Sequence, residues 1–221
     1  NTISEKHAKF TAENFTVYAA GRSAAIPDSS ALDGGLYKST DGGNSWATID
    51  NGIALVNGHR DMGTARAIVA DPRSCAAPPP SGPCATGSGG LQTLYAIGSG
   101  RPDFSGPGLP MRSARIYKST NAGASWTASE SGLPLPQDLD PGAGISFSYN
   151  IGIALVIDPS NTQTLYAVLT IGRLSSEPGM LEPTFPNGVF KSTNGGATWV
   201  HSSVGLPHYL SPASSQQDVL A

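Results

Sequence analysis

The stretch KSTDGGNSW at residues 38–46 occurs three times in this chain, returning as KSTNAGASW at 118–126 and as KSTNGGATW at 191–199. The three tryptophans of the protein close these three copies: Trp46, Trp126 and Trp199. A segment that repeats at long intervals is typical of repeat architectures, in which each copy belongs to one supersecondary unit. The repeats therefore predict a chain built from several similar units in a row.

Each copy has the chemistry of a tight hairpin. An apolar or aromatic pair precedes Lys-Ser-Thr, as in a half-buried strand, and a glycine-rich corner follows. An Asp or Asn side chain can accept hydrogen bonds from the turn, and glycine supplies positive φ without steric cost. The tryptophan then begins the returning strand, where its ring can enter a core. This assigns a structural role to Ser39, Asp41, Gly43, Trp46, Ser119, Asn121, Gly123, Trp126, Ser192, Asn194, Gly196 and Trp199.

A longer unit surrounds each hairpin and is clearest in the third copy. Residues 153–170 hold two apolar strands around an Asp-Pro-Ser-Asn turn, and a third strand leads into the hairpin and a fourth leaves it. The second unit has the same order, whereas the first strand of the first unit, at 3–10, has a weak pattern. Four antiparallel strands of this kind form one β-propeller blade. We predict an all-β chain with blades at about 3–50, 65–130 and 151–203, and the start of another strand at 218–221.

The hairpin resembles the Asp-box, the Ser-x-Asp-x-Gly-x-x-Trp repeat of β-propellers in sialidases, xyloglucanase-type glycoside hydrolases, sortilin-type receptors and a photosystem-assembly factor. Residues 39–46 fit this pattern fully, whereas the other two copies have Asn121 and Asn194 in place of aspartate. In that family the box is a structural turn remote from the active site. The resemblance thus implies propeller blades and does not imply catalysis.

Charge and hydropathy exclude several classes of partner. The net charge is −3 with only 13 Lys and Arg among 221 residues, which argues against a nucleic-acid partner. No apolar run approaches the roughly 20 residues that a membrane-spanning helix needs. No glycine-rich phosphate loop and no calcium-loop spacing occurs, so the sequence predicts neither a cofactor nor a metal.

The two cysteines, Cys75 and Cys84, flank a proline-rich segment. A metal site is disfavoured because no CxxC pair or histidine pair accompanies them. A disulfide that closes a small loop is the favoured interpretation, and it indicates an oxidising compartment. We therefore expect an extracellular, cell-surface or periplasmic location.

Strand order predicts where a ligand would bind. In an up-and-down blade, the hairpins and the cysteine loop share one end, and the longer connections of mixed composition share the other, as binding loops do. Aromatic rings that stack on sugars and paired carboxylates would make that second end a carbohydrate site, whereas the alternative is a set of solvated loop charges. Asp61 and Asp140 are the candidate catalytic residues. The candidate ligand-binding residues are His59, Arg60, Arg101, Asp103, Tyr149 and Arg173.

Three hypotheses for function follow. The favoured one is a non-enzymatic binding or scaffolding propeller with a carbohydrate or protein ligand. The second is a fragment of a xyloglucanase- or sialidase-like glycoside hydrolase. The third is a self-assembling structural subunit. Three blades are too few to close a ring, since propellers have about four to eight. The chain is therefore expected to belong to a larger propeller or to an assembly with further subunits.

Overall fold

The structure is a computed structural model and describes residues 16–22, 34–56, 59–60, 62–75, 83–84, 91–99, 115–133, 148–173 and 188–206. All regular structure in these ranges is β, and they contain no helix. The strands are β1 Val17–Arg22, β2 Gly34–Ser39, β3 Ala47–Thr48, β4 Leu55–Val56, β5 His59–Arg60, β6 Ala65–Ala70, β7 Leu94–Gly98, β8 Arg115–Ser119, β9 Thr127–Ala128, β10 Ser148–Ile157, β11 Leu165–Arg173, β12 Gly188–Ser192 and β13 Val200–His201.

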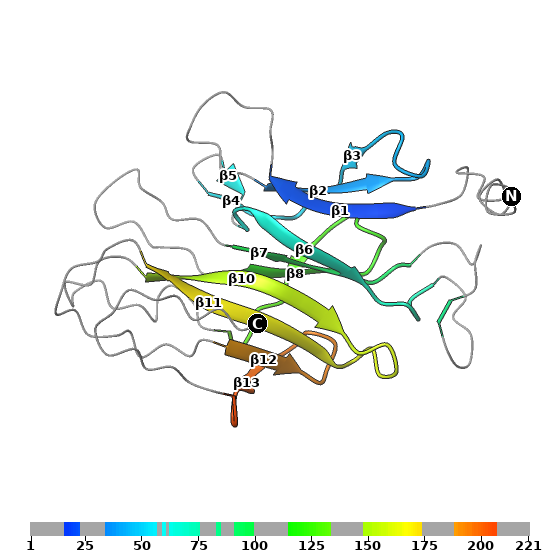
Figure 1. The fold of residues 1–221 in the computed structure, drawn as a ribbon. Helices are drawn as coiled ribbons and strands as arrows, with labels where there is room; N and C mark the ends of the chain where they lie inside the picture. The colour runs from blue at the N-terminus through cyan, green and yellow to red at the C-terminus, as the bar shows by residue number, and fades with distance from the viewer. Residues whose placement is uncertain are drawn as a thin grey trace, which may run out of the picture.

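Three antiparallel sheets follow one another along the chain and pack face to face (Figure 1). Blade 1 has the order β1-β2-β3, blade 2 the order β6-β7-β8-β9, and blade 3 the order β10-β11-β12-β13. In each blade a tyrosine pairs with a lysine on the next strand, just before the repeated hairpin: Tyr18 of β1 with Lys38, Tyr95 of β7 with Lys118, and Tyr166 of β11 with Lys191. The predicted all-β fold with propeller-type blades is thereby confirmed.

Two features of the fold differ from the expectation. Strand β10 begins at Ser148, before the expected start at 151, and is paired with β11 along its whole length apart from a bulge between Gly152 and Ala154. A small hairpin, β4–β5, lies in the connection between blades 1 and 2, where no strand was expected. The weak strand at 3–10 and the strand expected at 218–221 fall outside the described residues.

Within the described residues, two hydrophobic cores lie between blades. Core 1 joins blade 1 to blade 2 and contains Leu36, Ile53, Met62, Ala65, Leu94, Ala96, Tyr117 and Trp126. Core 2 joins blade 2 to blade 3 and contains Tyr95, Ile97, Ile116, Leu133, Leu155, Leu165, Ala167, Leu169, Phe190 and Trp199. Because alternate residues of a strand point to opposite faces, β7 sends Leu94 and Ala96 into one core and Tyr95 and Ile97 into the other. All five residues of β7 are therefore buried.

Candidate functional site

The repeated hairpins 39–46, 119–126 and 192–199, called the box hairpins below, use their polar groups within their own turns. In the second hairpin the Ser119 Oγ accepts the Gly123 N–H at 2.9 Å, and the Asn121 Oδ1 accepts the Ser125 N–H at 2.9 Å. The other two hairpins repeat both bonds, with Asp41 or Asn194 as the acceptor. The turn thus satisfies the backbone N–H groups that a tight corner would otherwise leave unpaired.

Asp41 is the one carboxylate among these three acceptors. Its side chain accepts hydrogen bonds from the Ser39 hydroxyl at 2.6 Å and from the Ser45 hydroxyl and backbone N–H. The hydrogen bond from Ser39, followed by those from Ser45, holds the pKa of Asp41 well below its usual value because they stabilise the charged form.

Two of the three box tryptophans lock neighbouring blades together. Trp199 is 2% exposed, and its indole N–H donates to the Ser129 carbonyl of blade 2 at 2.8 Å. Its backbone N–H donates to the Ser131 carbonyl at 2.8 Å. Trp126 makes the same two bonds to blade 1, through the carbonyls of Ile49 and Asn51. Each ring therefore seals a blade junction and is fully hydrogen-bonded there.

Trp46 differs, so the expectation of a core role fails for the first hairpin. Its side chain is 45% exposed, and its indole N–H donates to the Gly43 carbonyl of its own turn at 3.1 Å. The physical reason is the absence of a preceding blade within the described residues. The ring of a box tryptophan is buried by the blade before it, not by its own sheet.

A second contact reinforces the junction between blades 2 and 3. The Tyr95 hydroxyl and the Lys118 ammonium both donate to the Gly195 carbonyl of the third box hairpin, at 3.0 and 2.8 Å. The ammonium also lies 5.3 Å from the centre of the Tyr95 ring. Burial, with a smaller contribution from Asp71, raises the pKa of Tyr95 to about 12, and burial lowers the pKa of Lys118. We call this arrangement the Tyr–Lys clamp.

The clamp recurs between blades 1 and 2. Tyr18 and Lys38 both donate to the Ala122 carbonyl of the second box hairpin at 3.4 Å. Sequence reasoning saw the repeated tyrosine and lysine but missed the clamp, since the accepting carbonyl lies in the following unit, 104 residues from Tyr18. At this end of the sheets the repeated polar residues therefore hold blades together.

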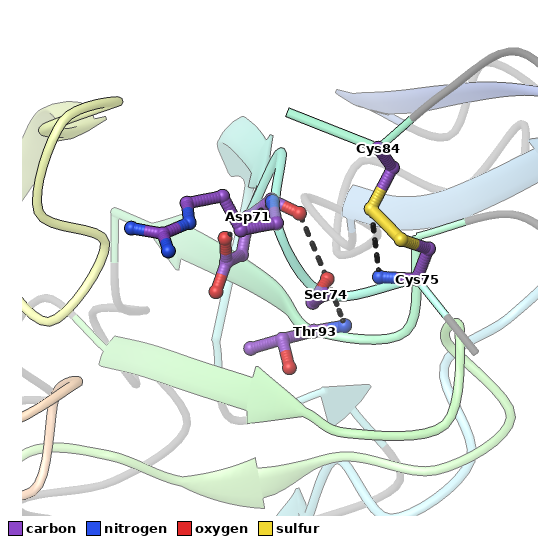
Figure 2. The surroundings of a disulfide bond; sticks show 6 residues. Asp71, Ser74, Cys75, Cys84 and Thr93 are labelled. Carbon is purple, nitrogen blue, oxygen red and sulfur yellow. Dashed lines mark hydrogen bonds between the residues drawn. A yellow bond between two sulfur atoms is a disulfide. The ribbon is translucent and has the colours of Figure 1, made fainter. Parts of the chain in front are cut away.

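The disulfide lies at the same end as the box hairpins, as expected from the strand order. Figure 2 shows the Cys75–Cys84 disulfide beside the turn that follows β6. The Ser74 hydroxyl donates to the Asp71 carbonyl at 2.8 Å and accepts the Thr93 N–H at 2.9 Å. The predicted disulfide is present and is tied to the sheet through this turn.

The opposite end of the sheets carries two ion pairs. Arg60 pairs with Asp50 beside the small β4–β5 hairpin, and Arg115 pairs with Glu130 where β8 begins. Asp50 and Glu130 occupy equivalent positions, four residues after the tryptophans of their hairpins. Arg60, a candidate ligand-binding residue, is therefore engaged with a carboxylate of its own chain.

Of the remaining candidate catalytic and ligand-binding residues, the structure describes the backbone of three. The backbones of Tyr149 and Arg173 lie opposite Gly172 and Ser148, so adjacent rungs of the β10–β11 ladder carry them at this end. His59 lies in β5 opposite Val56. The candidates that lie outside the described residues are Asp61, Arg101, Asp103 and Asp140.

An open pocket lies at the junction of blades 2 and 3, a site that sequence reasoning did not find. Its lining residues are Lys118, Thr127, Ala128, Ser129, Glu130, Ser131, Gly195, Gly196 and Ala197. Its two charged side chains are both engaged, Lys118 with the Gly195 carbonyl and Glu130 with Arg115. The pocket is thus a gap between two packed blades whose charged groups are already paired.

Within the described ranges, no group of three or more His, Cys, Asp or Glu side chains is arranged to hold a metal ion. The same residues include no helix of the length and hydropathy that crossing a membrane requires.

No family model matches the chain, and no curated protein matches it. Among solved structures, the chain is similar to the crystal structure of a GH74 enzyme from Niastella koreensis, with 20% sequence identity and a TM-score of 0.38. The similarity covers 85% of this chain and 28% of that enzyme's chain, so the present sequence spans less than a third of its length.

Proposed function

We propose that this protein is a secreted, propeller-type binding or scaffolding module whose ligand face is the end of the sheets opposite the box hairpins. The proposed position of the ligand face rests on the order of the strands. Strands β1, β7 and β11 all finish at that end, and each is followed by a long connection before the next strand of its blade. Long connections that follow strands ending at one end of packed sheets are the usual construction of a binding face.

The engagement of the described carboxylates supports a non-catalytic role. Asp41, Asp71 and Asp158 accept hydrogen bonds within their own turns. Asp50 and Glu130 are held in ion pairs with arginines. A general acid or base has to be directed at a substrate, whereas each of these groups serves the fold.

The proposed ligand is a carbohydrate or a protein. Tyr149 and Arg173 are proposed by residue type, each on its own: an aromatic ring can stack on a sugar or a peptide side chain, and a guanidinium is a planar donor for polar groups. The Cys75–Cys84 disulfide supports an oxidising compartment, where extracellular glycans and proteins are the available ligands.

Binding is tested with the full chain immobilised and probed by a panel of β-glucan and xyloglucan oligosaccharides and, in a second arm, by proteins of the same secretome. We expect Tyr149→Ala and Arg173→Ala each to weaken binding by about tenfold or more. Gln163→Ala is the matched control, because Gln163 is exposed at the box-hairpin end of blade 3. A control that weakens binding as much as these two variants would place the ligand face elsewhere.

Hydrolysis is the outcome that would replace the proposal. Release of new reducing ends from any of these oligosaccharides, lost in Asp61→Ala or Asp140→Ala, would make the protein a glycoside hydrolase. Absence of binding in both arms would leave no support for a ligand face at this end.

A further inference from the structure

Each blade junction joins two different faces. In the junction of blades 2 and 3, the inserting face belongs to blade 3 and consists of Leu165, Ala167, Phe190 and Trp199. The receiving face belongs to blade 2 and consists of Val69, Tyr95, Ile97, Ile116 and Leu133. The junction of blades 1 and 2 uses the equivalent positions, with Trp126 inserted against Leu36 and Ile53. A blade can therefore insert its tryptophan into the blade before it and receive the tryptophan of the blade after it.

The outer face of blade 3 repeats the receiving face but is open. Its equivalent residues are Val156, Tyr166, Val168, Val189 and Leu206. Val156 is 54% exposed and Leu206 is 37% exposed, although the equivalent of Leu206 in blade 2, Leu133, is only 4% exposed. The side chains of a junction core are thus present without a partner blade in the described residues.

The backbone socket for a tryptophan is also present on this face. Gly132 has φ of 87°, and a Cβ there would overlap the Trp199 carbonyl oxygen. Gly52 has the same φ of 87° and the same relation to Trp126. Gly205 is the third glycine of this series, with φ of 89°, and a Cβ there would meet no described atom within 4 Å. The backbone at Gly205 therefore has the conformation that receives a tryptophan, with the space still open.

The Tyr–Lys clamp repeats in the same open form. The Lys191 ammonium lies 5.4 Å from the centre of the Tyr166 ring, matching 5.3 Å for Lys118 and Tyr95. The other two pairs hold a carbonyl of the next box hairpin, whereas no described carbonyl occupies this position on Tyr166 and Lys191. Two separate elements of a receiving junction are therefore present on blade 3: the socket at Gly205 and the Tyr166–Lys191 pair of the clamp.

Blade 1 presents the complementary inserting face. Trp46 is 45% exposed, although its equivalents Trp126 and Trp199 are 2% exposed. The other residues of this face, Val17, Ala19 and Tyr37, are partly buried, whereas their equivalents in blades 2 and 3 are fully buried. The carbonyl that would accept the hydrogen bonds of the clamp is that of Gly42, the equivalent of Ala122 and Gly195.

We propose that two copies of this chain associate head to tail, with Trp46 of each copy seated in the Gly205 socket of the other. The chain has three tryptophans, and the two internal junctions use two of them. Trp46 of a second copy fits the open socket, because the inserting face of blade 1 has the same repeat positions as the faces that fill the two internal junctions. Two copies double the three blades of the described residues to six, within the range of about four to eight that closes a ring. Both new junctions are then equivalent by a two-fold axis.

Sedimentation equilibrium of the full chain over a range of concentrations tests the assembly. We expect a species of twice the 22.6 kDa chain mass, without larger species, because the ring closes at two copies. A monomer at about 100 μM would overturn the proposal, since a core-like interface of this kind should hold far below that concentration. The open faces would then be covered by blades other than those of a second copy.

Two variants locate the junction. Trp46→Ala removes the inserted ring, and Gly205→Asn fills the socket with a residue that tolerates positive φ. Each lies at an exposed position of the single chain, so the fold should persist, which circular dichroism checks. Since each substitution affects both junctions of a dimer, we expect the dissociation constant to rise by at least about 100-fold in either variant. A dimer that survives both changes would overturn the proposal.

Mixing the two variants separates a lost junction from a damaged fold. A mixed pair keeps one intact junction, between Trp46 of the Gly205→Asn chain and the socket of the Trp46→Ala chain. We expect the mixture to form a dimer more tightly than either variant alone. A mixture as weak as its two components would contradict the head-to-tail arrangement.

Discussion

The first and third box hairpins have nearly the same sequence and the same turn, but their tryptophans lie in opposite environments. The Ser39 and Ser192 hydroxyls accept the N–H of the glycine four residues later at 2.8 and 2.9 Å. The Asp41 and Asn194 side chains likewise accept the N–H four residues later, both at 2.9 Å. Trp46 is nevertheless 45% exposed and Trp199 only 2% exposed. The turn is a local structure, whereas the burial of its tryptophan requires the blade before it.

The difference shows how stability is distributed in a repeat protein. Each hairpin forms through contacts within about eight residues, but each core is shared by two blades, so stability resides in the junctions. A substitution in the same repeat position should therefore have very different effects at a closed junction and at an open face. Pairs of such substitutions, made at concentrations where the chain is a monomer, measure this difference.

The largest effect is expected at the buried tryptophan. Trp126→Ala should lower the free energy of unfolding by about 3–5 kcal/mol, because it empties core 1 and leaves the Ile49 carbonyl without its donor. Trp46→Ala should cost less than about 1 kcal/mol, as exposed substitutions do. Urea denaturation of both variants measures the difference, and equal losses would contradict the assignment of stability to the junctions.

A smaller but still large effect is expected at the junction glycines. Gly132→Ala should cost about 2–4 kcal/mol, since it adds strain at positive φ to an overlap with the Trp199 carbonyl. Gly205→Ala carries the strain without the overlap and should cost about 1–2 kcal/mol. The two thermal unfolding curves compare them directly, and a Gly205→Ala variant as unstable as Gly132→Ala would mean that its socket is already filled.

The cysteine loop allows a comparison between two equivalent turns. Asp71 and Asp158 open the corresponding turns of blades 2 and 3, but only the turn of blade 2 is closed by a disulfide. Reduction of Cys75–Cys84 should lower the free energy of unfolding by about 2–3 kcal/mol, through the added entropy of the unfolded loop. Melting with and without reductant measures this, with Cys75→Ser/Cys84→Ser as the control that should no longer respond. An unchanged melting temperature would place the loop outside the cooperative unit.

The smallest effect concerns acid. The folded pKa of Asp41 lies below its unfolded value of about 3.9, so its charged form stabilises the turn fully at neutral pH. That stabilisation is lost progressively as the pH falls below about 4. Asp41→Asn converts the first hairpin to the chemistry of the second and third and should reduce the slope of stability against pH in this window. Urea titrations at several pH values measure the slope of stability against pH. Some slope should remain in the variant, because the pKa of Asp158 is also lowered. An unchanged slope would show that the Asp41 hydrogen bonds do not contribute in solution.

Sequence alone predicted the repeating elements because their signals are local. The alternation before Lys38, the glycine corner and the spacing of Cys75 and Cys84 each involve a few neighbouring residues, and each corresponds to a strand, a turn or a disulfide in the structure. The β4–β5 hairpin escaped prediction because its two-residue strands are too short for a periodic pattern. The Tyr–Lys clamp escaped because its acceptor is a backbone carbonyl, which carries no signature in the sequence.

The sequence by itself determined the blades: three similar hairpins, their strands and the residues that would face a core. Only the tertiary structure decided which of those faces are covered, because burial depends on a partner that lies about 70 to 100 residues away along the chain. Trp46, Trp126 and Trp199 occupy one repeat position, and the presence or absence of a preceding blade gives them different roles. The proposed ligand face depends on the same kind of long-range information, since it is defined by strand order and not by any local pattern of its residues.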